Sequence, residues 1–204
     1  LLENRGNGTF RDISTASGTG AGATSSMTCS MGDINGDGFN DIGFGPQSGN
    51  EANGDYYFVF GSGNSLASYD VSKFAFDGTD GFKIVSDHDG VSAGVPITAG
   101  GDINGDGYED FYLLGFNATN GTGLRHGNTY VIYGGVNVGS TGVIDADSLN
   151  GTNGIVFTSD KENLIGQDLG DVNGDGLSDT IFFSYAQEPG VPYESVLVYG
   201  SDDS

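Results

Sequence analysis

Basic residues are scarce in this sequence. Lys and Arg total 6 against 28 Asp and Glu in 204 residues, which gives a formal net charge of -22 and a pI near 4.1. A surface of that sign repels phosphate backbones and anionic lipid headgroups, so we expect neither nucleic acid nor membranes as partners. We expect the charge to be neutralised by something else that the chain binds.

Cysteine and long apolar segments are also nearly absent. Cys29 is the single cysteine, so the chain cannot form an internal disulfide. No apolar run approaches the roughly 18 residues that a membrane-spanning helix needs. No signal peptide opens the sequence, and its start, "LLENRGNGTF", suits either a processed terminus or a cut through a longer protein. The 13 Phe, 10 Tyr and recurrent short Val, Ile and Leu runs nevertheless indicate a folded chain.

A ten-residue acidic segment occurs three times. "GDINGDGFND" starts at Gly32, "GDINGDGYED" at Gly101 and "GDVNGDGLSD" at Gly170, so the copies are 69 residues apart. Each copy leads into a hydrophobic run, at residues 41–44, 110–114 and 179–183. A second apolar run then ends in an aromatic residue and glycine, at 56–61, 130–134 and 196–200.

The pattern between the acidic segments predicts four short strands in each repeat. After the two apolar runs come "DGTDGFKIVS" (77–86) and "NGTNGIVFTS" (150–159), and a further short segment leads to the next acidic copy. Gly, Asn and Asp turns bound these runs, and no stretch has helical periodicity. We predict an all-β fold, a β-propeller-like array of four-stranded blades in three repeats of about 69 residues.

The predicted repeats form a single domain whose two ends share one split repeat. "GNGTFRDIS" aligns with 77–86 and 150–159, so residues 1–30 are predicted to be the second half of a blade. Repeat 1 then spans 31–99, repeat 2 spans 100–168, and residues 169–204 are the first half of a blade.

Half-repeats at both ends predict self-association. They would leave unpaired strand edges, which recruit other strands, and propellers typically need 4–8 blades. We expect either two chains that close a ring or a head-to-tail fibre. The alternative is a fragment of a larger surface protein.

The acidic segment has the donor pattern of a calcium loop. In D-x-N-x-D-G-x-x-D the side chains at positions 1, 3, 5 and 9 and the carbonyl at position 7 supply only oxygen, and the glycine at position 6 permits a sharp turn. The sequence therefore predicts three Ca²⁺ sites. The predicted ligands are Asp33, Asn35, Asp37, Phe39 (carbonyl) and Asp41; Asp102, Asn104, Asp106, Tyr108 (carbonyl) and Asp110; and Asp171, Asn173, Asp175, Leu177 (carbonyl) and Asp179.

The same segment could also be an EF-hand loop or an ordinary turn. An EF-hand requires a bidentate Glu at position 12, where this chain has Phe44, Leu113 and Phe182. Asp, Asn and Gly also cluster in ordinary turns, but three copies with every side-chain ligand intact favour metal binding.

These features together resemble FG-GAP repeats of the integrin α-subunit β-propeller kind, closest to the bacterial versions. The acidic loops, "FGPQSG" at 44–49, the "YVIYGG"-type strand and the "DGTDGF" segment carry the resemblance, and "LLENRGNGTFRDIS" resembles the tail of a VCBS-type repeat. The resemblance implies four-stranded blades with Ca²⁺ in the loop between the first two strands. It also implies an extracellular location and a role in adhesion, carbohydrate binding or scaffolding.

Catalysis is not predicted. The sequence has no G-x-S-x-G, P-loop or H-E-x-x-H motif, and His88 and His126 stand in polar segments. Four N-x-T sequons are candidate glycosylation sites. Asn7 and Asn150 fall in a turn of the repeat itself, so Asn117 and Asn120 are the better candidates.

The sequence thus predicts a non-enzymatic, calcium-stabilised extracellular structural or adhesion protein that self-assembles through complementary half-repeats. The alternative function is a propeller module that binds a carbohydrate or a protein ligand through loops on one face.

Overall fold

The chain is built from β-strands. The computed structural model describes residues 2–5, 10–12, 29–45, 55–63, 76–85, 97–119, 125–159, 164–184 and 194–202. Within these ranges there is no α-helix, and the single 3₁₀ turn is η2 (Ala146–Ser148). The all-β prediction is confirmed. No helix in the described part of the chain is long and apolar enough to cross a membrane.

Three sheets and a hairpin contain all the described strands. The hairpin joins β1 (Leu2–Asn4) and β2 (Phe10–Asp12). The first sheet has the order β10 (Val143–Asp145), β6 (Gly81–Val85), β5 (Tyr56–Val59), β4 (Asp41–Phe44) and β3 (Cys29–Gly32). The second has the order β11 (Gly154–Ser159), β9 (Arg125–Ile132), β8 (Phe111–Thr119) and β7 (Ile97–Ala99). The third has the order β12 (Leu164–Gly170), β13 (Asp179–Ser184) and β14 (Glu194–Val198).

Each sheet is an antiparallel meander of strands that follow one another along the chain. The apolar runs predicted as strands lie in β4, β5, β8, β9, β13 and β14. The exception to the meander is β10, which pairs in parallel with β6. No sequence pattern predicted this strand, because only the folded chain brings residues 143–145 beside the first sheet. None of the three sheets closes on itself.

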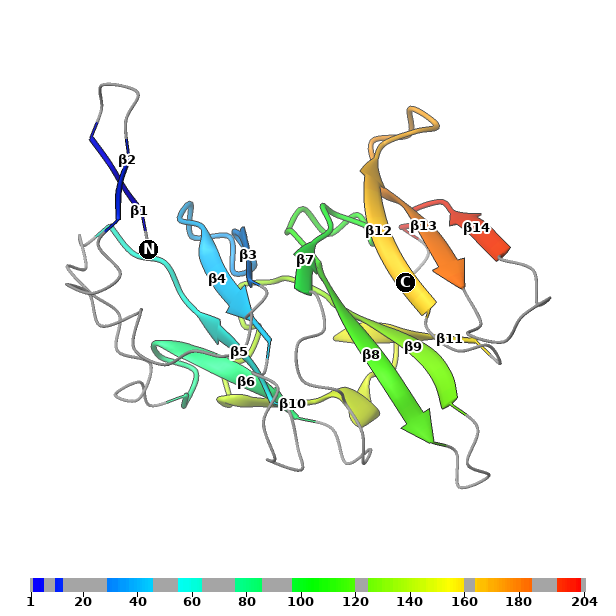
Figure 1. Ribbon diagram of the computed structural model, residues 1–204, viewed down its shortest axis with the longest axis horizontal. Coiled ribbons are helices and arrows are strands. Elements are labelled where there is room, and N and C mark those ends of the chain that lie inside the picture. Colours follow the sequence, from blue (N-terminus) through cyan, green and yellow to red (C-terminus); the bar gives the residue numbers. More distant parts are fainter. Residues whose placement is uncertain are drawn as a thin grey trace.

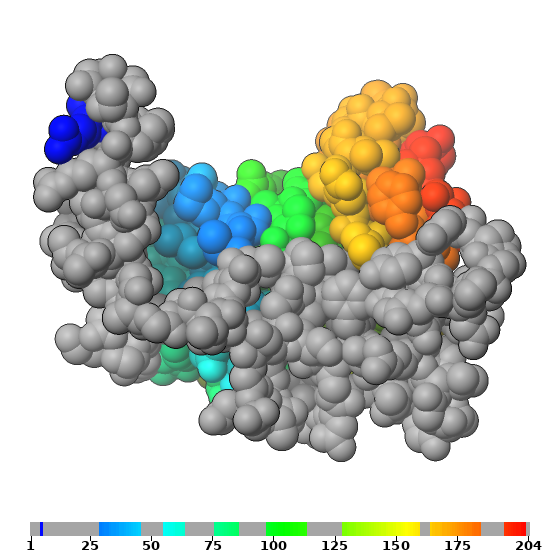
Figure 2. All heavy atoms as spheres, in the orientation of Figure 1, coloured from blue at the N-terminus to red at the C-terminus, as the bar shows by residue number. Residues whose placement is uncertain are grey.

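The three sheets stand side by side in chain order (Figure 1). The β1–β2 hairpin lies at one end of the molecule and the third sheet at the other. In the space-filling view, orange and red atoms of the third sheet lie at the surface in the upper part of that end (Figure 2). The second sheet therefore lies between two other sheets, whereas the third sheet has one neighbour among the sheets that the structure describes.

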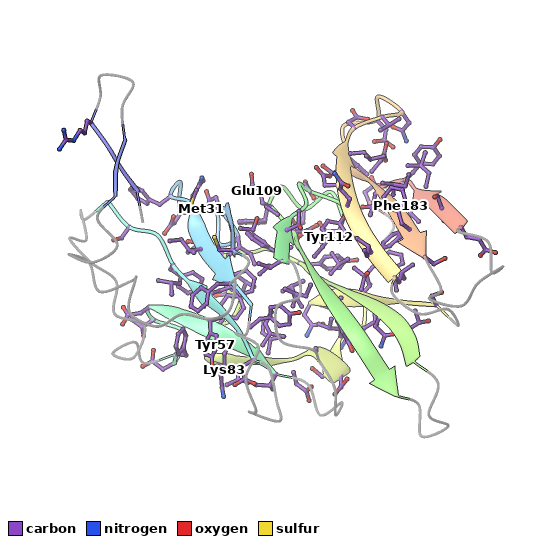
Figure 3. All side chains as sticks on the ribbon, viewed as in Figure 1. Met31, Tyr57, Lys83, Glu109, Tyr112 and Phe183 are labelled. Carbon is purple, nitrogen blue, oxygen red and sulfur yellow. The ribbon has the colours of Figure 1, made fainter. Side chains whose placement is uncertain are left out.

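The core lies between the sheets and follows the two-residue alternation of the strands. In β8, Phe111 and Leu113 point into the cluster shared with the first sheet, and Tyr112 points into the cluster shared with the third. Phe58 of the first sheet stacks on Phe82 at 4.8 Å between ring centroids and meets Phe111 edge-on at 5.1 Å. Tyr112 lies between β8 and β12 (Figure 3), and its hydroxyl is hydrogen-bonded to Thr180.

Candidate metal loops

The acidic segments form three equivalent loops between strands. We call residues 33–41 the first acidic loop, residues 102–110 the second and residues 171–179 the third. They connect β3 to β4, β7 to β8 and β12 to β13, which are the first two strands of each meander. Strands flank all three loops, as the sequence predicted when it excluded an EF-hand.

The first aspartate of each loop organises the backbone. Asp33 Oδ1 accepts hydrogen bonds from the N–H groups of Gly36 at 2.8 Å and Asp37 at 3.0 Å, and its Oδ2 accepts from Gly38 at 2.9 Å. Asp102 and Asp171 make the same three bonds in their loops, at 2.6–3.1 Å. Because these bonds span five residues, each loop forms from its own local sequence.

The next two polar positions continue the pattern. Asn35 Oδ1 accepts from the N–H of Asp37 at 2.9 Å, and Asp37 Oδ1 accepts from the N–H of Phe39 at 2.8 Å. The second and third loops repeat both bonds at 2.9–3.1 Å. Gly36 and Gly38 have φ values of +75° and +89°, a region that other residues enter only at a cost.

The ninth residue of each loop is buried and serves a different role. Asp41 Oδ2 accepts from the N–H of Ile34 at 3.0 Å, and its Oδ1 accepts from the N–H of Gly61 at 2.7 Å, just beyond β5. Burial raises the pKa of Asp41 to about 6, although the bonds from Gly61 and Ile34 act to lower it.

The other two loops have the same clamp. Asp110 accepts from Ile103 at 2.9 Å and from Gly134 at 2.9 Å, and Asp179 accepts from Val172 at 2.8 Å and Gly200 at 3.0 Å. Burial raises the pKa of Asp110 to about 7. Each ninth residue thus ties its loop to the end of the third strand of the meander.

The glycine after the third strand is a site residue that sequence reasoning missed. A β-carbon on Gly134 would lie 2.5 Å from the carbonyl oxygen of Glu109, and one on Gly200 would lie 2.7 Å from that of Ser178. Only glycine lets the strand end come close enough to donate to the buried aspartate. The signal for this glycine in the sequence is the aromatic-Gly pair that ends the second apolar run of each repeat.

The loops also lie at the junctions between sheets. The carbonyl of Ile34 accepts from the N–H of Gly135 at 2.8 Å, and the N–H of Asp33 donates to Glu109 Oε2 at 3.0 Å. Glu109 lies between β3 and β7 in Figure 3. One junction further along, the carbonyl of Ile103 accepts from the N–H of Ser201 at 3.0 Å. The first loop thus contacts the second sheet, and the second loop contacts the third.

Whether a metal ion suits these loops depends on the atoms that the loops offer as ligands. Positions 1, 3, 5, 7 and 9 offer carboxylate, amide and carbonyl oxygen, which hard cations such as Ca²⁺ prefer, and no thiol or imidazole. A carboxylate has about four acceptor sites, so the three bonds to Asp33 do not exhaust it.

The described residues do not bring three carboxylates into one group. Among them, no cluster of three or more His, Cys, Asp or Glu side chains is arranged to hold a metal ion. At the ninth position the aspartate accepts hydrogen bonds from backbone N–H groups. The chemistry of the loop suits Ca²⁺, and binding itself stays a prediction.

One predicted glycosylation site has described side-chain contacts. Asn150 is exposed, and its Oδ1 accepts from the N–H of Thr152 at 3.0 Å, as Asp77 Oδ1 does from Thr79 at 3.0 Å. The turn chemistry expected at this sequon is present. Asn117 lies in β8 with its side chain outside the described set, and Asn7 and Asn120 lie outside the described residues. Cys29 is exposed and free.

Comparison with known proteins is informative for the N-terminal part of the chain. Residues 1–44 match the family model described as FG-GAP-like repeat, a stretch that ends at the close of β4 and contains the first acidic loop. No curated protein matches the sequence. Residues 1–44 are therefore identified as an FG-GAP-like repeat, which is consistent with an FG-GAP-type repeat family for the chain.

Proposed function

We propose that this chain is a non-enzymatic, calcium-stabilised repeat protein of the extracellular surface, with a structural or adhesive role. FG-GAP repeats suggest a surface or adhesion protein, and the family is generally non-enzymatic and typically extracellular. In this proposal the chain is a propeller-like array of three repeats of about 69 residues, with four strands to a blade.

One observation carries the proposal. The same loop, with the same internal hydrogen bonds, is built three times between the first two strands of a meander, and two of the loops also contact the next sheet. A cation in such a loop would stabilise the strand pair and the junction together.

The charge balance favours a bound cation. Each loop carries three aspartates within nine residues of sequence, and repulsion between like charges opposes folding. Three Ca²⁺ ions would change the formal net charge from -22 to -16. The ligands in the first loop would be Asp33, Asn35, Asp37, the carbonyl of Phe39 and Asp41, with the corresponding residues in the other two.

Self-association through half-repeats is supported by the edge of the third sheet. In the first two sheets the third strand of the meander pairs with a fourth, β6 or β11, whereas β14 is the last strand described in its sheet. By sequence, the segment that contains β2 corresponds to β6 and β11. We propose that this segment of a second chain pairs with the free edge of β14.

Calorimetric titration with CaCl2 tests the calcium proposal directly. We expect a stoichiometry of three for the chain and two for Asp102→Asn, which has no charge and whose one amide oxygen can still accept from Gly105 and Asp106 but not also from Gly107. Asp80→Asn, an exposed aspartate outside the loops, is the control and should still bind three. An absence of calcium uptake by the folded chain would overturn the proposal.

A binding module is the second candidate, and one feature favours it. Tyr108 and Tyr133 line an open hollow of about 390 Å³ together with the turn at residues 136–141. Both rings are partly buried, and the part of a tyrosine ring that stays open offers a flat apolar face with a polar tip, which suits a sugar ring. Probing a glycan array with the monomeric chain tests the binding-module proposal, since a purely structural subunit would bind no glycan.

A further inference from the structure

The exposed side of the third sheet repeats a surface that is buried in the other two sheets. The second residue of each acidic loop shows this most clearly. Ile34 and Ile103 are 0% and 5% exposed because the next sheet covers them, whereas Val172 at the same position is 56% exposed. The local loop geometry is the same, so the difference comes from the neighbour alone.

The third strand of each meander shows the same contrast. Phe58, Val131 and Leu197 are equivalent, because each lies three residues before the glycine that follows the third strand. Phe58 and Val131 are both 0% exposed, and Leu197 is 39% exposed. Tyr199, at the position of Phe60 and Tyr133, is also exposed. We call Val172, Leu197 and Tyr199 the open face.

At each of the two junctions within the chain, the side chain at position 7 of the next acidic loop covers this surface. The ring of Tyr108, at position 7 of the second loop, occupies the space beside Gly36 that a β-carbon would need. At the next junction Leu177 does the same, and a β-carbon on Gly105 would lie 3.1 Å from Leu177 Cδ2. Among the described atoms, nothing lies within 4 Å of that point on Gly174.

The chain carries one spare copy of the covering element. Phe39 holds position 7 of the first loop, where Tyr108 and Leu177 stand in the others, and it is 45% exposed. Asn40 and Ser62, which correspond to Glu109 and Gly135, are exposed beside it. We call Phe39, Asn40 and Ser62 the covering edge.

We propose that the open face of the third sheet binds the covering edge of a second copy of this chain, and so repeats the junction that joins the sheets within one copy. Phe39 would pack over Gly174, and the N–H of Ser62 would donate to the carbonyl of Val172, as Gly135 and Ser201 donate to Ile34 and Ile103. The inference rests on the proposed function in one respect, because it specifies the surface through which the chain self-associates.

The contact is heterologous, since one copy uses its open face and the other its covering edge. Heterologous contacts produce rings or filaments. With Phe39 over Gly174, the first acidic loop of one copy would lie next to the third acidic loop of the other, and both loops are rich in aspartate. A cation that reduces this repulsion should therefore strengthen association.

Sedimentation velocity of the full chain in CaCl2 and in EDTA tests the inference. We expect concentration-dependent association in Ca²⁺. Phe39→Ser, which keeps the backbone carbonyl, and Val172→Ser should each weaken it at least tenfold, while Val143→Ser, at a residue 41% exposed on β10, should leave it unchanged. Calorimetry on each variant verifies that the loops still fold and take up calcium.

Mixing the two variants provides the decisive arm. Phe39→Ser retains its open face and Val172→Ser retains its covering edge, so an equimolar mixture should form 1:1 dimers that neither variant forms alone. A monomeric chain that binds three Ca²⁺ would overturn this inference and leave the calcium proposal standing. Failure to bind calcium with association intact would overturn the calcium proposal alone. Association that neither substitution weakens would show that the interface lies elsewhere.

Discussion

The carboxylate of Asp41 accepts a hydrogen bond from the backbone N–H of Gly61 at 2.7 Å and thereby ties the first acidic loop to the end of β5. The pairs Asp110–Gly134 and Asp179–Gly200 repeat this bond at 2.9 and 3.0 Å. The same carboxylates also hold the second residue of their loops. The ninth aspartate therefore connects three segments of the sheet.

Removal of this clamp should destabilise the fold. Asp110→Ala leaves the N–H groups of Ile103 and Gly134 without their acceptor, and an unsatisfied buried donor costs about 1–3 kcal/mol. Because burial of the charged carboxylate is itself unfavourable, we expect the free energy of unfolding to fall by about 2–4 kcal/mol in total. Urea denaturation in excess EDTA measures the effect without a contribution from metal.

Asp80→Ala is the matched control for the clamp. Asp80 is exposed, and surface substitutions usually change stability by less than about 0.5 kcal/mol. Equal unfolding midpoints for Asp110→Ala and the unmodified chain would contradict the structural role of the buried aspartate.

The close approach of Gly134 gives a second prediction. A methyl group there would meet the carbonyl oxygens of Glu109 and Ile34 at 2.5 and 2.8 Å, both on backbone that cannot rotate away. Gly134→Ala should therefore cost about 1–3 kcal/mol, as overpacking typically does. Thermal unfolding followed by circular dichroism measures it. Gly63→Ala is the comparison, because its β-carbon would meet only the Phe39 ring, at 3.1 Å. A smaller loss for Gly134→Ala than for Gly63→Ala would refute the steric argument.

Removal of metal should lower the melting temperature. A ligand that binds only the folded state stabilises it by about 2.7 kcal/mol per site at a hundredfold excess over Kd. For a chain of this size that corresponds to about 5–10 °C per occupied site. Differential scanning calorimetry in CaCl2 and in EDTA measures the shift, and excess CaCl2 added after EDTA should restore it. Identical melting curves in the two buffers would rule out stabilisation by calcium.

The junction between the first and second sheets should be far more sensitive to truncation than the open face. Phe58 is fully buried between Phe82 and Phe111, and Phe→Ala substitutions in cores cost about 3–5 kcal/mol. Leu197→Ala, at the corresponding position of the third sheet, should cost the monomer less than about 1 kcal/mol. Urea denaturation at low protein concentration compares them. Similar losses for the two variants would mean that the open face is covered within one chain.

Much of this architecture was predictable because its causes are local. The repeat of Asp, Asn and Gly predicted three equivalent loops, and the bonds from Asp33 to Gly36, Asp37 and Gly38 join neighbours in the sequence. The short apolar runs bounded by Gly, Asn and Asp turns likewise predicted strands such as β4 and β13. The match of residues 1–44 agrees with the family inferred from those same motifs.

Other features depended on which segments meet after folding. The sequence predicted Asp41 as a calcium ligand, which stays a prediction, but it did not predict that the folded chain buries this carboxylate against the N–H groups of Ile34 and Gly61. The parallel pairing of β10 with β6 joins residues about sixty positions apart and has no local signal. Most plainly, the sequence treats Ile34, Ile103 and Val172 as equivalent, yet the first two are buried and the third is exposed. Local sequence is enough to shape each loop because its hydrogen bonds are short-range, but the exposure of a side chain is a property of its neighbours, and only the tertiary structure supplies them.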